Sequence, residues 1–155
     1  MDVWSGDSIK LIRGDYFAFD ETKAGRRFDA VFDRASLVAI EPSKRDEYVD
    51  IMGELVQPGG KILLVTIEKR AGDDEACQAG PPYSISETDV RKLYEGQDWV
   101  ESVEMLDEYD EFQLDPGGVD RWLKKGVSAM YELAFLVTAK RKEKAAQGNK
   151  SNPVE

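Results

Sequence analysis

Histidine is absent from the 155 residues, and cysteine occurs once, at Cys77. The absence of histidine excludes His-dependent catalytic triads and removes the most common general base and the usual zinc ligand. A single cysteine excludes an intramolecular disulfide and a cysteine-based metal cluster. We therefore expect no metal site and a reducing, cytoplasmic setting.

Signals for nucleotide loops and for membranes are also missing. Neither Gly-x-Gly-x-x-Gly nor Gly-x-x-x-x-Gly-Lys-Ser/Thr occurs in the chain, so nothing in it can hold a phosphate or an amino-acid carboxylate through a glycine loop. No apolar run is long enough to cross a membrane, and the first residues lack the regions of a signal peptide. The net charge of -10 disfavours nucleic acid and anionic membranes as partners.

What remains is typical of one soluble α/β domain. Hydrophobic residues make up 41% of the chain and charged residues 34%, which are ordinary values for a globular protein. We expect residues 1–139 to form the domain. Residues 140–155 are polar, and we expect a short helical extension there followed by a disordered tail.

Strand and helix patterns alternate along the chain. Five stretches have the apolar patterns of strands, namely residues 9–13, 28–32, 61–67, 99–106 and 132–139. One helix is predicted between an N-cap at Ser43 and a stop at Pro58-Gly59-Gly60, and a second from Ser86 to Gly96. Residues 69–83 are predicted to be a loop, and Trp122 lies in a short amphipathic stretch. The pattern predicts a mostly parallel sheet with an antiparallel pair at one edge.

Ligands of open α/β sheets bind at the carboxyl ends of the strands, and three candidate segments are expected at such ends. In Gly14-Asp15-Tyr16-Phe17, a carboxylate could accept from an exocyclic amine and an aromatic ring could cover a purine; the alternative is a plain turn with a hydrophobic plug. Asp33 and Arg34 are expected to emerge at the next strand's end, facing the cleft. An arginine there can bind a carboxylate or a polarised heteroatom, and the alternative is an ion pair between neighbouring surface charges.

A third segment, Gly80-Pro81-Pro82-Tyr83, ends the predicted loop. Two prolines stiffen the backbone, which suits the wall of an apolar pocket, although rigid loops without a function are common. Cys77 lies in the same loop, but no suitable base is near it in sequence. We interpret it as a free surface or half-buried thiol.

Taken in order, these segments resemble the thiopurine S-methyltransferase family. The most specific similarity combines Asp33-Arg34-x-x-Leu37-Val38-Ala39-Ile40 with Gly80-Pro81-Pro82-Tyr83. The resemblance implies a Rossmann-like fold that binds S-adenosylmethionine (SAM) as methyl donor, of which this chain supplies strands three to seven. It places Asp15 and Tyr16 at the adenine end of SAM, Arg34 between cofactor and substrate, and Pro81 and Pro82 beside the acceptor.

The implied acceptor is a small aromatic or heterocyclic thiol of the thiopurine kind. Because a thiolate is already a nucleophile, no general base is required, and we assign no catalytic residue. In the family, residues 9–13 correspond to the third strand, so the first two strands and the glycine loop are expected before Met1. We therefore expect an N-terminally incomplete enzyme; the alternative is a non-catalytic remnant or interaction module. The oligomeric state stays open.

Overall fold

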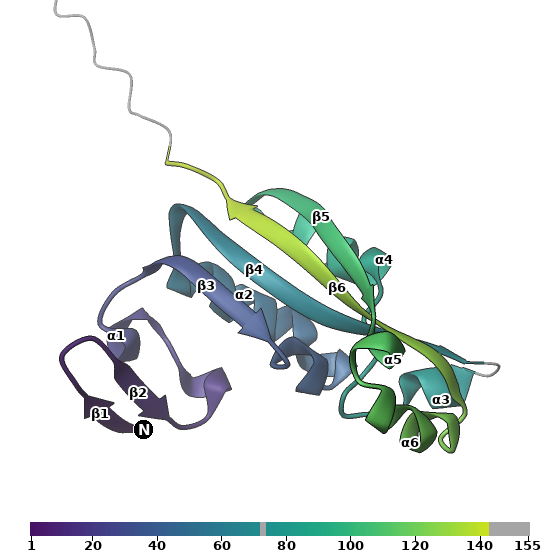
Figure 1. The fold of residues 1–155 in the computed structure, drawn as a ribbon. Helices are drawn as coiled ribbons and strands as arrows, with labels where there is room; N and C mark the ends of the chain where they lie inside the picture. Colours follow the sequence, from purple (N-terminus) through teal and green to yellow (C-terminus); the bar gives the residue numbers. More distant parts are fainter. Residues whose placement is uncertain (72–73, 143–155) are drawn as a thin grey trace, which may run out of the picture.

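The computed structural model describes residues 1–71 and 74–142, which form an α/β fold around one four-stranded sheet (Figure 1). The strands lie in the order β3 (Phe28–Arg34), β4 (Val56–Ala71), β6 (Val127–Ala139) and β5 (Val100–Asp110). β3 and β4 pair in parallel, and β6 pairs antiparallel with both β4 and β5. Three of the four strands therefore run in one direction, which confirms the mostly parallel sheet with an antiparallel edge. Most of the predicted tail, from residue 143 onward, lies outside the described residues.

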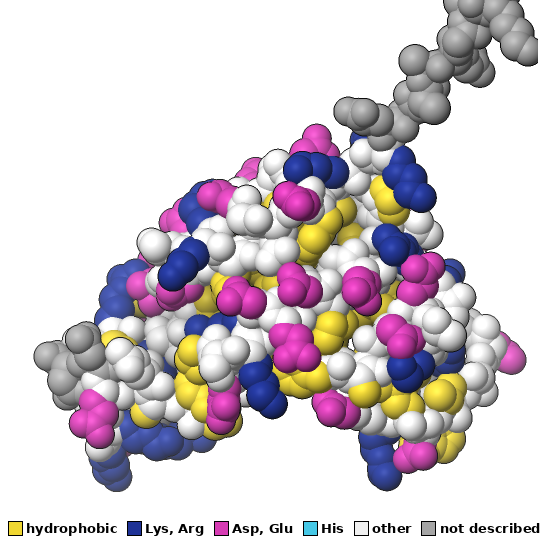
Figure 2. All heavy atoms as spheres, turned by 180° about the vertical axis from the view of Figure 1, so that it is seen from behind, with side chains coloured by type: hydrophobic (Ala, Val, Ile, Leu, Met, Phe, Trp, Pro, Cys, Tyr) yellow, Lys and Arg dark blue, Asp and Glu magenta, His cyan; other side chains and the backbone are white. Residues whose placement is uncertain are grey.

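Helices α2 (Arg45–Leu55) and α4 (Glu87–Glu95) cover one face of the sheet, behind it in Figure 1. Alternate residues of β4, such as Ile62 and Leu64, are fully buried on this face together with Phe135 of β6. Each such side chain contributes about 1.5–3 kcal/mol by leaving water. Figure 2, which views this side, shows acidic and basic side chains spread over the solvent surface of the layer.

The opposite face of the sheet is open over most of its area. It faces the viewer in Figure 1, and α5 (Glu111–Leu114) lies at one end of it. Phe32 is 65% exposed, and Leu63 and Leu106 are exposed as well. Apolar side chains therefore reach solvent on this face, which is unusual for a strand that is paired in parallel.

The first predicted strand is present but takes a different place. β2 (Lys10–Arg13) pairs antiparallel with β1 (Asp2–Ser5) in a separate two-stranded sheet and is not hydrogen-bonded to the four-stranded sheet. Within the described residues, no strand pairs with both β2 and β3. The backbone groups of β2 form their hydrogen bonds with β1 instead. α1 (Glu21–Ala24) follows, and its Ala24 carbonyl oxygen accepts from Lys10 Nζ at 3.2 Å.

The helix boundaries differ from the sequence prediction at α2 and agree at α4. A 3₁₀ turn (Pro42–Lys44) precedes α2, so Ser43 lies inside that turn and caps nothing. The helix ends at Leu55, before the predicted stop at Pro58-Gly59-Gly60. These three residues belong instead to the irregular beginning of β4, where the register with β3 shifts. Ser86 caps α4 as predicted, in a capping box with Asp89.

The strands are longer than predicted, and part of the predicted loop is regular. β4 continues to Ala71 because its ladder with β6 extends from Lys61 opposite Thr138 to Arg70 opposite Ala129. α3 (Asp74–Gln78) occupies the middle of the stretch predicted as a loop. A 3₁₀ turn (Pro116–Gly118) and α6 (Val119–Leu123) hold the predicted amphipathic stretch around Trp122.

The two edges of the sheet differ in composition, and this difference predicts how the isolated chain behaves. β5 carries exposed acidic residues along its length, at Glu101, Glu104, Asp107 and Glu108, and such charges protect an edge strand from pairing with other chains. β3 forms the other edge, exposes Phe32 and pairs on its outer side with no described strand.

We expect the 155-residue chain to self-associate through β3. Phe32→Lys should shift it toward the monomer, because a lysine on an edge strand opposes edge-to-edge pairing. Leu106→Lys on β5, which also replaces an exposed apolar side chain, is the matched control and should leave association unchanged. Size-exclusion chromatography with light scattering measures both, and equal behaviour of the two variants would contradict a role for β3.

Candidate functional site

The carboxyl ends of β3 and β4 meet at one edge of the sheet because these strands are parallel. Arg34 is the last residue of β3, and Ala35 follows it with φ at 66°. This left-handed conformation is uncommon for a residue other than glycine. It turns the chain sharply into the 3₁₀ turn Leu37–Ala39, so that Arg34 stands at the end of the strand.

The guanidinium of Arg34 is held on one side and open on the other. Its Nη2 lies 2.5 Å from Glu132 Oε1 on β6, and the Arg34 side chain remains 55% exposed. The ion pair that the sequence offered as an alternative role for Arg34 is therefore formed, but with a residue far away in sequence. The pair also influences Glu111 on α5: burial raises the pKa of Glu111, the charge of Glu132 adds to this rise, and Arg34 opposes it. Within the described part of the chain Glu132 is the ion-pair partner of Arg34, which leaves further N–H donors of the guanidinium able to face a ligand.

Asp33 does not face the cleft, contrary to the expectation from sequence. Its side chain is buried, and Tyr48 Oη on α2 donates to Asp33 Oδ2 at 2.8 Å. Successive residues of a strand point to opposite faces, so the residue next to an exposed Arg34 must enter the helix-covered layer. Burial raises the pKa of the Asp33 carboxyl, and hydrogen bonds from Tyr48 and from the Leu37 backbone oppose this rise.

Asp15 and Tyr16 lie in a turn that follows β2, and the ring of Tyr16 packs against the core. Asp15 is exposed and its Oδ1 accepts from the N–H of Phe17 at 3.0 Å, which caps the 3₁₀ turn Tyr16–Ala18. The ring of Tyr16 stacks on Tyr48 with centroids 4.4 Å apart, and its hydroxyl donates to the Tyr48 carbonyl oxygen at 3.3 Å. Burial raises the pKa of Tyr16. Tyr48 therefore joins the turn to Asp33.

Two hollows adjoin this turn. One, of about 350 Å³, is lined by both Asp15 and Tyr16. The other, of about 330 Å³, lies along β3 and combines Tyr16 with mainly apolar side chains that include Phe28, Phe32 and Met52. The sequence candidates for the adenine end of a cofactor thus line concave surface next to β3.

The Gly80–Tyr83 segment is fixed against the same edge of the sheet. Tyr83 N–H donates to the Val38 carbonyl oxygen at 2.7 Å, in the turn that follows Arg34. Gly80 packs so closely that an added Cβ would lie 2.3 Å from the Tyr83 ring, so only glycine fits. Pro81 lines a cavity of about 480 Å³ and Pro82 is half-buried beside it. The structure thereby joins the Arg34 turn to the Pro81-Pro82 segment.

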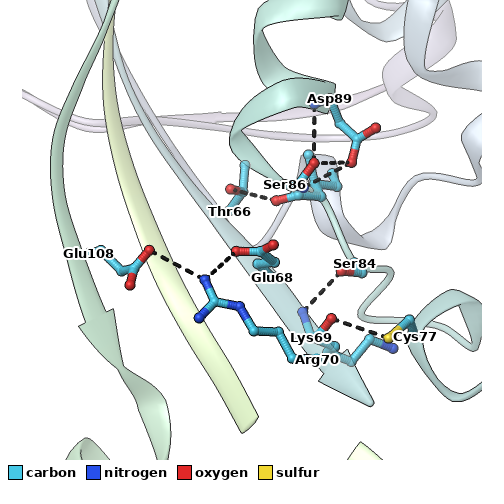
Figure 3. Close-up of polar contacts among 10 residues, drawn as sticks. Thr66, Glu68, Lys69, Arg70, Cys77, Ser84, Ser86, Asp89 and Glu108 are labelled. Atoms are coloured by element: carbon cyan, nitrogen blue, oxygen red, sulfur yellow. Dashed lines mark hydrogen bonds and ion pairs between the residues drawn. The ribbon is translucent and has the colours of Figure 1, made fainter. Parts of the chain in front are cut away.

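Ser84 and Ile85 continue this anchoring toward β4. Lys69 N–H donates to Ser84 Oγ at 2.9 Å (Figure 3), and Ile85 N–H donates to the Ile67 carbonyl oxygen at 2.8 Å. Sequence reasoning missed Lys69 because residue 69 was placed in a loop. It also missed the contact between Tyr48 and Asp33, since a tyrosine on the apolar face of a helix gives no sign of a polar partner.

Within residues 1–71 and 74–142, the side chains include no group of three His, Cys, Asp or Glu placed to hold a metal ion. In the same part of the chain, no helix has the length and apolar character needed to cross a membrane.

The strand order β3-β4-β6-β5 with a reversed β6, covered by helices on one face, gives the described chain a Rossmann-like α/β fold. The [4+2]-cyclase SpnF is similar with a TM-score of 0.52 at 17% identity, covering 83% of this chain and 54% of that chain. A structure titled for the conversion of a disulfide bond into a thioacetal group in echinomycin biosynthesis gives 0.50 at 15% identity, covering 83% and 55%. At such identities the likeness establishes the fold alone.

Sequence comparison gives the family. The family model for thiopurine S-methyltransferase matches residues 1–140, and the chain belongs to this family. The thiopurine S-methyltransferase of Nitrosospira multiformis is 32% identical over 136 residues, which cover 88% of this chain and 56% of the relative. That of Vibrio campbellii is 32% identical over 139 residues, covering 90% and 57%. The chain thus spans a little over half the length of these relatives.

The burial of Asp33 predicts a pH dependence of stability. Because its pKa is raised in the folded chain, the folded state binds the proton more tightly than the unfolded state. The contribution of Asp33 is therefore fully present below the unfolded value of 3.8 and is lost as the pH rises through the higher folded pKa. One such proton gives a slope of up to about 1.4 kcal/mol per pH unit between the two values.

Asp33→Asn should remove this slope. Urea unfolding from about pH 4 to about pH 8 measures it. Asp50→Asn on α2, which replaces an exposed carboxylate, is the control and should keep the slope of the parent chain. A parent-like slope in Asp33→Asn would show that other groups cause the pH dependence.

Proposed function

We propose that the protein acts as a SAM-dependent S-methyltransferase on small aromatic or heterocyclic thiols of the thiopurine kind. One observation carries the proposal. In a chain of this family, the exposed guanidinium of Arg34 stands at the carboxyl end of a strand that is paired in parallel. The turn that follows Arg34 also anchors the Gly80–Tyr83 segment, because the Tyr83 N–H donates to the Val38 carbonyl oxygen.

The residues present fit a part of a SAM site. Asp15 is exposed and lines a hollow with Tyr16, which supports their assignment to the adenine end. Arg34 keeps donors that its pair with Glu132 leaves free, and these suit a carboxylate or the sulfur of an acceptor. No glycine loop is present in the sequence, so this chain supplies one portion of such a site. When bound, SAM supplies a methyl group already activated by a sulfonium.

The protein's role toward the acceptor thiol is to hold it in position. Pro81 and Pro82 form a rigid wall that holds an apolar ring and limits access of water. Arg34 steadies the acceptor or the cofactor so that the sulfur lies in line with the methyl group. A thiolate attacks without a general base, which agrees with a sequence without histidine. A cytoplasmic location is part of this proposal, since free thiols persist in a reducing compartment.

Binding of SAM provides the first test. We expect the 155-residue chain alone to show no SAM binding by isothermal titration calorimetry, because no glycine loop holds the amino-acid end. A chimera that adds the portion of the Nitrosospira multiformis relative left uncovered by the match should bind SAM and methylate thiols. Micromolar binding by the chain alone would contradict the need for a glycine loop. A folded chimera that binds no SAM would favour a non-catalytic module.

Arg34 provides the second test. In the chimera, Arg34→Ala should lower kcat/KM for an aromatic thiol by about tenfold to a hundredfold, the value of a lost charge-assisted hydrogen bond. Arg34→Lys should recover only part of this, because an ammonium lacks the planar fork. Arg91→Ala is the matched control, since Arg91 is held by Glu87 and Glu95 on α4. Unchanged kcat/KM in Arg34→Ala would remove Arg34 from the site.

A further inference from the structure

The cavity of about 480 Å³ lies where β4 ends, β6 begins, and α3 and α6 approach each other. Figure 1 shows α3 and α6 at this end of the sheet. The walls of the cavity are mostly apolar and include Pro81, Val127 and the ring of Trp122. The charged residues on its lining are Lys69, Lys125 and Glu75. A volume of this size is within the range of small-molecule sites, roughly 300–1,000 Å³.

Lys69 is a buried cation without a carboxylate partner among the described side chains. The residue is 4% exposed, and its Nζ donates to the carbonyl oxygen of Ala79. Cys77 Sγ donates to the Lys69 carbonyl oxygen at 3.3 Å (Figure 3), so the residue is fixed at the cavity wall. A buried ammonium is costly unless it is paired and hydrogen-bonded, and one neutral acceptor meets little of that requirement.

The next residue in the chain shows what a compensated cation looks like here. Arg70 Nη2 lies 3.0 Å from Glu68 Oε2 and 3.6 Å from Glu108 Oε2 (Figure 3), and its guanidinium stacks over Tyr131. Arg70 is nevertheless the more exposed of the two cations. The buried cation therefore has fewer partners than its exposed neighbour, which is the reverse of what stability alone would favour.

A second cation and an aromatic ring complete the cavity. Lys125 Nζ lies 5.1 Å from the centroid of Trp122 and forms no ion pair within the described residues. Burial lowers the pKa of Lys69, and the charge of Lys125 lowers it further, so the two ammonium groups act on each other. Glu75, the carboxylate on the lining, is exposed. Among the described side chains of the lining, two cations therefore stand against one carboxylate.

We propose that this cavity binds a small aryl carboxylate, whose carboxylate pairs with Lys69 and Lys125 and whose ring lies against Trp122 and Pro81. The two ammonium groups require an anion, and the apolar walls require that the rest of the ligand be apolar and flat. Such a ligand would supply the charge that Lys69 lacks. Because Pro81 belongs both to this cavity and to the proposed acceptor wall, the acceptor itself would carry the carboxylate. This last step rests on the proposed function, whereas the binding site does not.

Direct titration of the 155-residue chain tests the site. Phenylacetate should bind more tightly than its neutral isostere 2-phenylacetamide by about tenfold or more, the value of a charge-assisted hydrogen bond. Lys69→Met should weaken phenylacetate by about tenfold, and Lys125→Gln by about threefold because Lys125 is exposed. Chemical-shift changes at the indole N–H of Trp122 report the binding.

Controls separate binding from folding. Lys124→Gln changes an exposed lysine outside the cavity and should leave phenylacetate binding unchanged. If Lys69→Met fails to fold, the comparison of Lys125→Gln with Lys124→Gln still decides the matter. Equal affinities for phenylacetate and 2-phenylacetamide, or equal effects of Lys125→Gln and Lys124→Gln, would overturn the proposed site.

The link to methyl transfer is tested in the chimera. With 4-mercaptophenylacetate as acceptor, Lys125→Gln should raise KM about threefold, whereas the KM for 4-methylbenzenethiol should not change. Equal effects on both thiols would overturn the assignment of the carboxylate to the acceptor. Methylation of neither thiol would sink the proposed function and, with it, the link to the acceptor. The titrations with phenylacetate would then still decide the site itself.

Discussion

The pairing of β4 with a strand on each side is the constraint on which the rest of the structure depends. Its parallel ladder with β3 fixes the edge at which Arg34 stands, and its antiparallel ladder with β6 brings Glu132 to that edge. The Gly80–Tyr83 segment then returns to β4 through Ser84 and Ile85. Arg34 is thus positioned by the pairing of β3 with β4, and the Gly80–Tyr83 segment by hydrogen bonds to the Arg34 turn and to β4.

Local patterns in the sequence were sufficient for the elements that local chemistry determines. The capping box at Ser86 and the apolar strand that begins at Lys61 were predicted because caps and unbroken aliphatic runs have few alternatives. Ser43 misled the prediction because Pro42 opens a 3₁₀ turn of its own. The place of β2 was beyond local reasoning, since the pairing of a strand depends on which other strands are present.

The residues of the candidate site also differ in how well their positions could be predicted from the sequence. Arg34 was correctly predicted to stand at the end of a strand, because an apolar strand pattern closes just before it, whereas its role in binding stays a prediction. Asp33 was misplaced, although strict alternation along β3 would have put it opposite Arg34. Lys69 could not be singled out, because its burial arises from the packing of α3 and the following segment rather than from its own neighbours in sequence.

The aromatic stack between Tyr16 and Tyr48 has a consequence for the order in which the protein opens. β1 is exposed along its whole length, and β2 buries little more, so the hairpin has few contacts of its own to resist unfolding. The turn that follows it attaches to the core through the rings of Tyr16 and Phe17, and Tyr16 stacks on Tyr48. Residues 1–15 therefore form a unit of low local stability, whose amide hydrogens exchange far faster than those of β4. A ligand that covers Tyr16 would slow this exchange. Binding at Tyr16 could then be detected as slower amide exchange in the β1–β2 hairpin, even where the ligand does not contact the hairpin itself.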